Sequence, residues 1–187
     1  MKTGEPIVFD RPATWVAMVG FMGTGKSRIG WELSRALALH FIDTDKVIER
    51  VAGMPISQIF ELLGEATFRA YEEEVIRRVA KLEQVVISCG GGTFVNPVNR
   101  RVLLARGPVV CLHASPETIF QRTRRFPRVL LQVPDPIARI TELLASRESA
   151  YGEADIQVST EGRNSRDVVQ ETVQRLEALR VMVKEDE

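Results

Sequence analysis

Apolar and polar positions follow one another along the chain in a pattern that predicts short buried strands separated by amphipathic helices. Residues 14–19 form an apolar run, and residues 26–39 repeat apolar side chains at helical spacing. Further strands are predicted at residues 40–43, 84–89, 107–114 and 154–159. Helices are predicted at residues 44–52, 56–63, 66–83, 97–105, 116–124, 137–148 and 166–183. This alternation indicates an α/β fold whose parallel sheet is covered on both faces.

The length and composition indicate one domain. The chain has 187 residues, of which 44% are hydrophobic and 27% charged, as is typical of a globular protein. We expect a disordered N-terminal extension at residues 1–12, a single domain at residues 13–183 and a frayed acidic tail at residues 184–187. Residues 124–136 contain three prolines and show poor periodicity, which predicts a mobile lid over about residues 122–136.

Charge and cysteine content narrow the classes of partner. The formal net charge is zero, so the chain has no overall attraction to nucleic acid or to a membrane surface. No apolar run approaches the ~18 residues of a membrane span, and the first residues lack the apolar segment of a signal peptide. Cys89 and Cys111 lie in apolar runs, as expected of buried, reduced thiols. We therefore expect a cytoplasmic protein that acts on small molecules.

A glycine-rich loop, G-F-M-G-T-G-K-S at residues 20–27, lies between the first predicted strand and the first predicted helix. It matches the pattern G-x-x-x-x-G-K-[ST], in which backbone N–H groups and a helix N-terminus bind phosphates. Lys26 can reach the β- and γ-phosphates, and the Ser27 hydroxyl can bind Mg²⁺. A tight turn with an incidental lysine is the alternative, but the flanking elements favour a nucleoside triphosphate site.

The second predicted strand is followed by D-T-D, which is Asp43-Thr44-Asp45. Asp43 can hold Mg²⁺ through water, and Asp45 can accept hydrogen bonds from the hydroxyl groups of a second substrate. Either carboxylate could instead cap the following helix. Because ligands of such sheets bind at the carboxyl ends of the strands, we expect both near the glycine-rich loop.

Two further segments suggest an acceptor site. In F-R-A-Y-E, residues 68–72, Glu72 could steer Arg69 toward an anionic substrate while Phe60 and Phe68 form an apolar wall. The alternative is a simple i,i+3 ion pair on a helix. Three consecutive glycines, Gly90-Gly91-Gly92, follow a predicted strand and would allow a ligand to approach the backbone closely. A flexible turn is the other interpretation.

Together, G-F-M-G-T-G-K-S, D-T-D, F-R-A-Y-E and G-G-G resemble the motifs of shikimate kinases in order and spacing, over about residues 16–178. The resemblance implies a three-layer P-loop kinase fold, with five parallel strands in the order 2-3-1-4-5 and a mobile lid. It also implies transfer of the γ-phosphoryl group of ATP to the 3-hydroxyl of shikimate, in aromatic amino acid biosynthesis. Mg²⁺ is the implied cofactor, and a monomer is expected.

The resemblance assigns roles to individual residues. The implied catalytic residues are Lys26, Asp45 and Arg128, and the implied metal ligands are Ser27 and Asp43. The implied ATP-binding residues are Gly23, Thr24, Gly25, Lys26, Ser27, Arg28, Arg122, Arg128 and Arg163. The implied shikimate-binding residues are Asp45, Arg69, Gly90, Gly91, Gly92 and Arg147, with both Arg69 and Arg147 directed at the carboxylate.

Four positions depart from the family's pattern. Val129 replaces a proline of the lid, Ser149 and Ala150 replace proline and leucine in Arg-x-Pro-Leu-Tyr, and Ser165 stands where proline often packs near adenine. These changes leave open the stiffness of the lid and the orientation of Arg147. Two alternatives also remain: another small-molecule kinase such as a gluconate kinase, and a non-catalytic nucleotide-binding relative.

Overall fold

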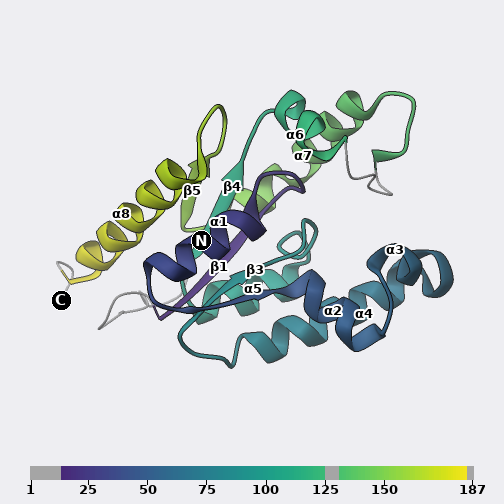
Figure 1. Cartoon of the computed structure of the whole chain (residues 1–187). Coiled ribbons are helices and arrows are strands. Elements are labelled where there is room, and N and C mark those ends of the chain that lie inside the picture. Colours follow the sequence, from purple (N-terminus) through teal and green to yellow (C-terminus); the bar gives the residue numbers. More distant parts are fainter. Residues whose placement is uncertain (1–13, 125–130, 185–187) are drawn as a thin grey trace.

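A five-stranded parallel sheet lies at the centre of the computed structural model, which describes residues 14–124 and 131–184 (Figure 1). The strands are β1 (Trp15–Gly20), β2 (His40–Asp43), β3 (Val85–Ser88), β4 (Val109–His113) and β5 (Ile156–Ser159). Every neighbouring pair is parallel, and the strand order is β2-β3-β1-β4-β5. This confirms the predicted fold class and strand order.

Helices connect successive strands, as the polar and apolar pattern predicted. They are α1 (Lys26–Ala36), α2 (Thr44–Ala52), α3 (Ile56–Gln58), the π-helix η1 (Ile59–Leu63), α4 (Gly64–Val79), α5 (Pro97–Arg106), α6 (Pro116–Thr123), α7 (Pro136–Gly152) and α8 (Ser165–Lys184). Side-chain caps begin α2, α5, α6 and α7, at Asp43, Asn96, Ser115 and Asp135 respectively. Within the described ranges, the helices are too short or too polar to cross a membrane.

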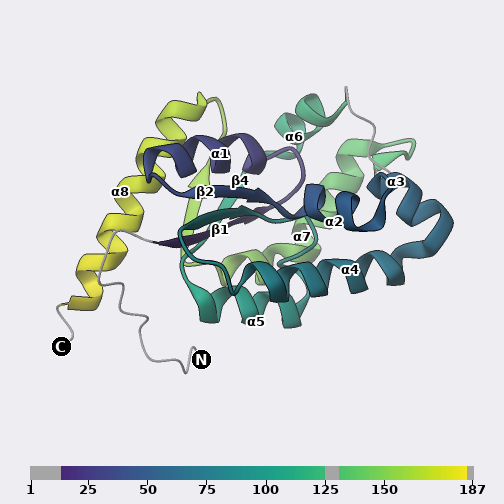
Figure 2. The same cartoon turned by 60° about the horizontal axis from the view of Figure 1, so that its bottom comes forward.

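The two faces of the sheet are covered by different helices, which explains why β1 is apolar throughout. Val16 and Met18 pack with apolar side chains of α1 and α8 on one face. Trp15, Ala17 and Val19 pack with α4, α5 and α7 on the other. Figure 2 shows these two helical layers on opposite sides of the strands. Burial on both faces favours an unbroken apolar run over an alternating one.

Several element boundaries differ from the sequence prediction. The helix predicted over residues 26–39 ends at Ala36, and Ala38 adopts a left-handed φ of 56° before β2 begins. The single helix predicted over residues 56–63 is α3 followed by the π-helix η1. The last helix extends to Lys184, which the prediction placed in the tail. The predicted extension at residues 1–12, the lid residues 125–130 and the tail residues 185–187 lie outside the described residues.

Candidate active site

The phosphate loop, residues 20–27, joins β1 to α1 as a compact turn. Gly23 and Gly25 adopt φ values of 79° and 97°, which are favourable only for glycine. The Thr24 hydroxyl and the Lys26 ammonium both donate to the Phe21 carbonyl, each at 2.8 Å. The loop is therefore closed on itself at the N-terminus of α1, where backbone N–H groups favour a bound phosphate.

Lys26 holds its positive charge in a buried position. Lys26 is only 8% exposed. Burial lowers the pKa of the Lys26 ammonium below 10.5, and the nearby Asp45 carboxylate partly opposes this shift. A cation in such a setting attracts an anionic ligand more strongly than an exposed lysine does, because solvent screening is weaker.

Ser27 and Asp43 meet at the end of the sheet, as their strand-end positions predicted. The Ser27 hydroxyl donates to the Asp43 Oδ2 atom at 2.6 Å. The Asp43 Oδ1 atom accepts the N–H groups of Asp45 and Lys46, at 3.1 and 3.4 Å, and caps α2. Asp43 therefore caps α2 with one carboxylate oxygen, and its other oxygen lies beside Ser27, where it could also bind a metal. The Ser88 hydroxyl lies 3.5 Å from that of Ser27, a neighbour that the sequence did not reveal.

A hydroxyl and a carboxylate suit Mg²⁺, which commonly takes one or two protein oxygens and completes its coordination with phosphates and water. Among the residues that the structure describes, no cluster of three or more His, Cys, Asp or Glu side chains could hold a metal by itself. The Ser27–Asp43 pair therefore fits a metal bound together with a nucleotide.

Beside the phosphate loop lies a cavity of about 400 Å³, here called the acceptor pocket. Phe60 and Phe68 form one wall, with their ring centroids 4.7 Å apart. All of the residues predicted to bind shikimate line this cavity: Asp45, Arg69, Gly90, Gly91, Gly92 and Arg147. The pocket therefore brings together side chains from three distant motifs and from α7.

Glu72 links the F-R-A-Y-E segment to the glycine triplet. Its carboxylate is buried, with 1% exposure, and accepts hydrogen bonds from Arg69 Nη1 at 3.0 Å and from Thr93 Oγ1 at 2.7 Å. Arg69 also contacts Glu65 at 2.9 Å. The ion pair considered from the sequence is thus present, and it holds an arginine that lines the acceptor pocket. Thr93 was not predicted, because its partner is 21 residues away in the chain.

The glycine triplet passes close to charged groups of the pocket. A Cβ atom at Gly90 would lie 2.7 Å from Asp45 Oδ1, and one at Gly92 would lie 2.8 Å from Arg69 Nη1. The Gly90 N–H donates to the Thr44 hydroxyl at 3.1 Å. Within the described part of the chain, the N–H groups of Gly91 and Gly92 have no acceptor, so they remain available to a ligand.

Arg147 reaches the acceptor pocket from α7 despite the two replaced residues of the R-E-S-A-Y segment. Its Nη1 atom donates to the Gly91 carbonyl at 3.2 Å. Its guanidinium lies 5.1 Å from the centroid of the Phe21 ring, a cation–π distance. The departures from the family's pattern therefore leave Arg147 directed at the pocket.

A second cavity of about 410 Å³, the nucleotide pocket, lies on the other side of the phosphate loop. Arg122 donates to the hydroxyl and the carbonyl of Thr160, each at 2.8 Å, and to the Gly23 carbonyl at 3.3 Å. Arg163 pairs with Glu171 and holds the loop that follows β5. The predicted ATP-binding residues that line this cavity are Thr24, Gly25, Arg28, Arg122 and Arg163. Arg128 lies outside the described residues.

Because the phosphate loop separates a nucleotide pocket from an acceptor pocket lined by charged side chains, the fold and the site define a small-molecule kinase of the P-loop class. The family profile of shikimate kinase matches residues 22–177. The shikimate kinase of Deinococcus radiodurans is 57% identical over 173 residues, which cover 92% of this chain and 88% of that protein. The chain belongs to the shikimate kinase family.

Solved structures agree with this assignment. Shikimate kinase from Acinetobacter baumannii, in complex with shikimate, superimposes with a TM-score of 0.85 at 36% identity, covering 89% of this chain and 94% of that one. A gluconokinase from Sinorhizobium meliloti superimposes with a TM-score of 0.64 at 19% identity, covering 94% of this chain and 97% of that one. The second likeness shows a shared fold only, so the gluconate kinase alternative is not favoured.

Proposed function

We propose that this chain transfers the γ-phosphoryl group of ATP to the 3-hydroxyl of shikimate. The observation that carries the proposal is the composition of the acceptor pocket, in which the Asp45 carboxylate and the guanidinium groups of Arg69 and Arg147 line one cavity. Shikimate offers hydroxyl groups to the carboxylate and a carboxylate to the two arginines, which bind such groups in charge-assisted hydrogen bonds. Membership of the shikimate kinase family supports the same acceptor.

The phosphate loop holds the triphosphate with its backbone N–H groups and with Lys26. Ser27 and Asp43 would hold Mg²⁺, which, when bound, neutralises charge on the transferring phosphoryl group. Arg122 and Arg163 shape the nucleotide pocket on the far side of the loop, where Arg28 also lies. Arg128 stays a predicted phosphate contact from the lid. The protein's contribution is mainly alignment and charge, since phosphoryl transfer needs little covalent help.

Asp45 orients the attacking hydroxyl and accepts its proton. As the 3-oxygen forms its bond to the γ-phosphorus, the bond from that phosphorus to the bridging oxygen breaks, and ADP leaves with the electron pair. Arg69 and Arg147 hold the carboxylate, which directs the hydroxyl groups of the ring toward Asp45 and the phosphate loop. Glu72 fixes Arg69 in this position through the 3.0 Å contact.

We also propose a cytoplasmic location for the enzyme. Cys89 and Cys111 are buried free thiols in the structure. Such unpaired cysteines are typical of proteins from reducing compartments.

The test is ADP release by the purified protein with ATP and Mg²⁺, measured with shikimate, with gluconate and with no acceptor. We expect shikimate-dependent release, none with gluconate and loss of release when the metal is chelated. The variant Asp45→Asn should lower kcat by at least about 100-fold, because it removes the proton acceptor. Release with gluconate alone would overturn the acceptor assignment. ATP binding without turnover on any acceptor would favour the non-catalytic relative.

A further inference from the structure

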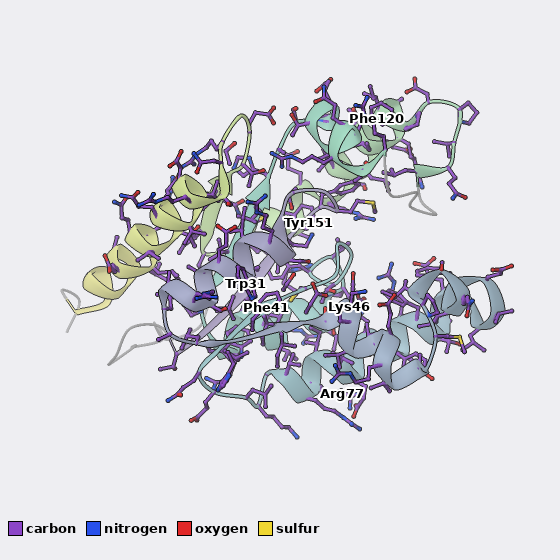
Figure 3. All side chains as sticks on the ribbon, in the orientation of Figure 1. Trp31, Phe41, Lys46, Arg77, Phe120 and Tyr151 are labelled. Atoms are coloured by element: carbon purple, nitrogen blue, oxygen red, sulfur yellow. The ribbon has the colours of Figure 1, made fainter. Side chains whose placement is uncertain are left out.

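Tyr151, which is labelled in Figure 3, lies at the C-terminal end of α7 and contacts the glycine triplet. Its hydroxyl donates to the Gly91 carbonyl at 2.7 Å, between residues 60 apart in the chain. The same carbonyl accepts the Arg147 Nη1 atom at 3.2 Å. Arg147 and Tyr151 are spaced i,i+4, so they lie on one face of α7. The Gly91 carbonyl oxygen therefore accepts two hydrogen bonds from α7, at the edge of the acceptor pocket.

The hydroxyl of Tyr151 serves as a permanent donor. The residue is 8% exposed, and burial raises the pKa of its hydroxyl to about 12, so the group stays protonated at physiological pH. Its backbone is fixed as well, because the Gln157 side chain donates to the Tyr151 carbonyl at 2.7 Å.

The ring of Tyr151 packs in the hydrophobic core, and its hydroxyl carries the polar contact. The residue also lines a further cavity of about 500 Å³ together with Phe21, Cys111 and Leu144. Core packing places the ring, and the hydrogen bond to the Gly91 carbonyl satisfies the hydroxyl at the end of the side chain.

The Gly91 carbonyl controls the direction of a neighbouring donor. A peptide unit is planar and trans, so the orientation of the Gly91 C=O group determines that of the Gly92 N–H group. Glycines leave this unit free to rotate as a whole unless something holds it. The Gly92 N–H has no acceptor among the described residues, and Gly92 lines the acceptor pocket.

We propose that Tyr151 is a positioning residue for shikimate binding: through the Gly91 carbonyl, it aims the Gly92 N–H and Arg147 into the acceptor pocket. This proposal rests on the proposed roles of Arg147 and the glycine triplet. It also accounts for how Arg147 stays oriented when Ser149 and Ala150 stand in place of the stiffer residues of the family's pattern.

The test compares Tyr151→Phe, which keeps the ring and removes only the hydroxyl, with the wild-type protein. Shikimate and Mg-ADP affinities are measured by titration calorimetry. We expect shikimate to bind about three- to tenfold more weakly while Mg-ADP affinity stays unchanged. The melting temperature should fall by only about 2–4 °C, as expected for one lost buried hydrogen bond. Tyr71→Phe is the matched control, because Tyr71 is the other tyrosine of the chain and lies half-buried on α4 outside both pockets.

A double-mutant cycle with Arg147→Ala tests whether the two side chains act together on shikimate binding. We expect the combined loss of shikimate affinity to differ from the product of the two single losses. If the loss of shikimate affinity in the double variant equalled the product of the two single losses, Tyr151 and Arg147 would act independently and the proposed coupling would be wrong. Wild-type shikimate affinity in Tyr151→Phe, or equal losses of affinity for shikimate and Mg-ADP, would overturn the proposal. Unchanged affinity in Arg147→Ala would instead overturn the role of Arg147 itself.

Discussion

The buried charge of Lys26 makes ATP binding sensitive to pH. In the ligand-free protein, burial lowers the pKa of the Lys26 ammonium below the 10.5 of an ordinary lysine, so the group loses its proton at a lower pH than an exposed lysine does. A bound triphosphate places negative charge beside the group and raises its pKa again. Proton uptake on ATP binding should therefore increase as the pH rises toward 10.5.

Titration calorimetry of ATP binding in buffers of different ionisation enthalpy measures this proton uptake. The variant Lys26→Met should bind ATP more weakly and should show no such uptake at any pH, because the titrating group is gone. If the binding enthalpy of the wild-type protein did not depend on the buffer at any pH below 10.5, Lys26 would remain fully charged without a ligand.

Single residues of the site could be predicted where a motif or a strand end located them. Ser27 and Asp43 were expected near each other because the carboxyl ends of parallel strands share one edge, and their oxygens lie 2.6 Å apart. Thr93 and Tyr151 gave no such signal. Their partners lie 21 and 60 residues away, and no local spacing encodes a contact that only the folded chain creates.

At the scale of elements, the glycine triplet passes close to the side chains of Asp45 and Arg69. The variant Gly90→Ala would place a methyl group 2.7 Å from Asp45 Oδ1 and 3.1 Å from Thr93 Oγ1. One of these groups must move, and a shift of about 1 Å at a reacting group costs on the order of 100-fold in rate. We expect kcat/KM for shikimate to fall by about that factor while the protein stays folded, as measured in steady-state assays and by thermal unfolding.

Gly152→Ala is the control for this variant. Nothing lies within 4 Å of a Cβ atom at Gly152, the last residue of α7, so activity should be unchanged. Stability should rise slightly, by about 0.4–1 kcal/mol, because alanine restricts the unfolded chain. Wild-type activity in Gly90→Ala would contradict the steric argument and would favour the flexible-turn interpretation of the triplet.

Helices and strands could be predicted where the apolar periodicity and the residues at the element ends indicated the same structure. The prediction was less accurate where one apolar pattern is compatible with two kinds of structure. The strands β1, β3 and β4 are apolar runs buried on both faces, which leaves little choice of structure. The π-helix η1 was predicted as part of an α-helix, since the apolar spacing over five residues is compatible with both. Phe60 of η1 packs against Phe68 of α4 in the acceptor pocket, a contact between two elements that apolar spacing alone does not specify.

At the scale of the whole molecule, two groups of helices flank the carboxyl ends of the strands. The elements α2, α3 and α4 lie on one side of this edge, and α6 and α7 lie on the other (Figure 1). The phosphate loop lies between them, so it contributes to both pockets. The resemblance to shikimate kinases implied the strand order on which this edge depends. Periodicity gave the alternation of strands and helices but not the order of the strands.

We predict a monomer from the distribution of exposed apolar side chains. A stable homodimer interface buries roughly 800 Å² of surface on each partner, and its core is mostly apolar. The large apolar side chains that are exposed in the described residues come from five elements and from loops: Trp31, Val51, Leu62, Leu63, Leu82, Val98, Val133 and Ile137. Trp31 is also partly covered by Arg35, which lies 5.2 Å from its ring.

We therefore expect one sedimenting species with the monomer mass of 21.0 kDa at all accessible protein concentrations. Specific activity should be constant on dilution, since both pockets are formed within one chain. A mass that rises toward twice this value with concentration would contradict the monomer. If specific activity fell together with the mass on dilution, a second copy would have to support the site. The variant Leu62→Ser would then identify η1 as the contact if it restored the monomer mass.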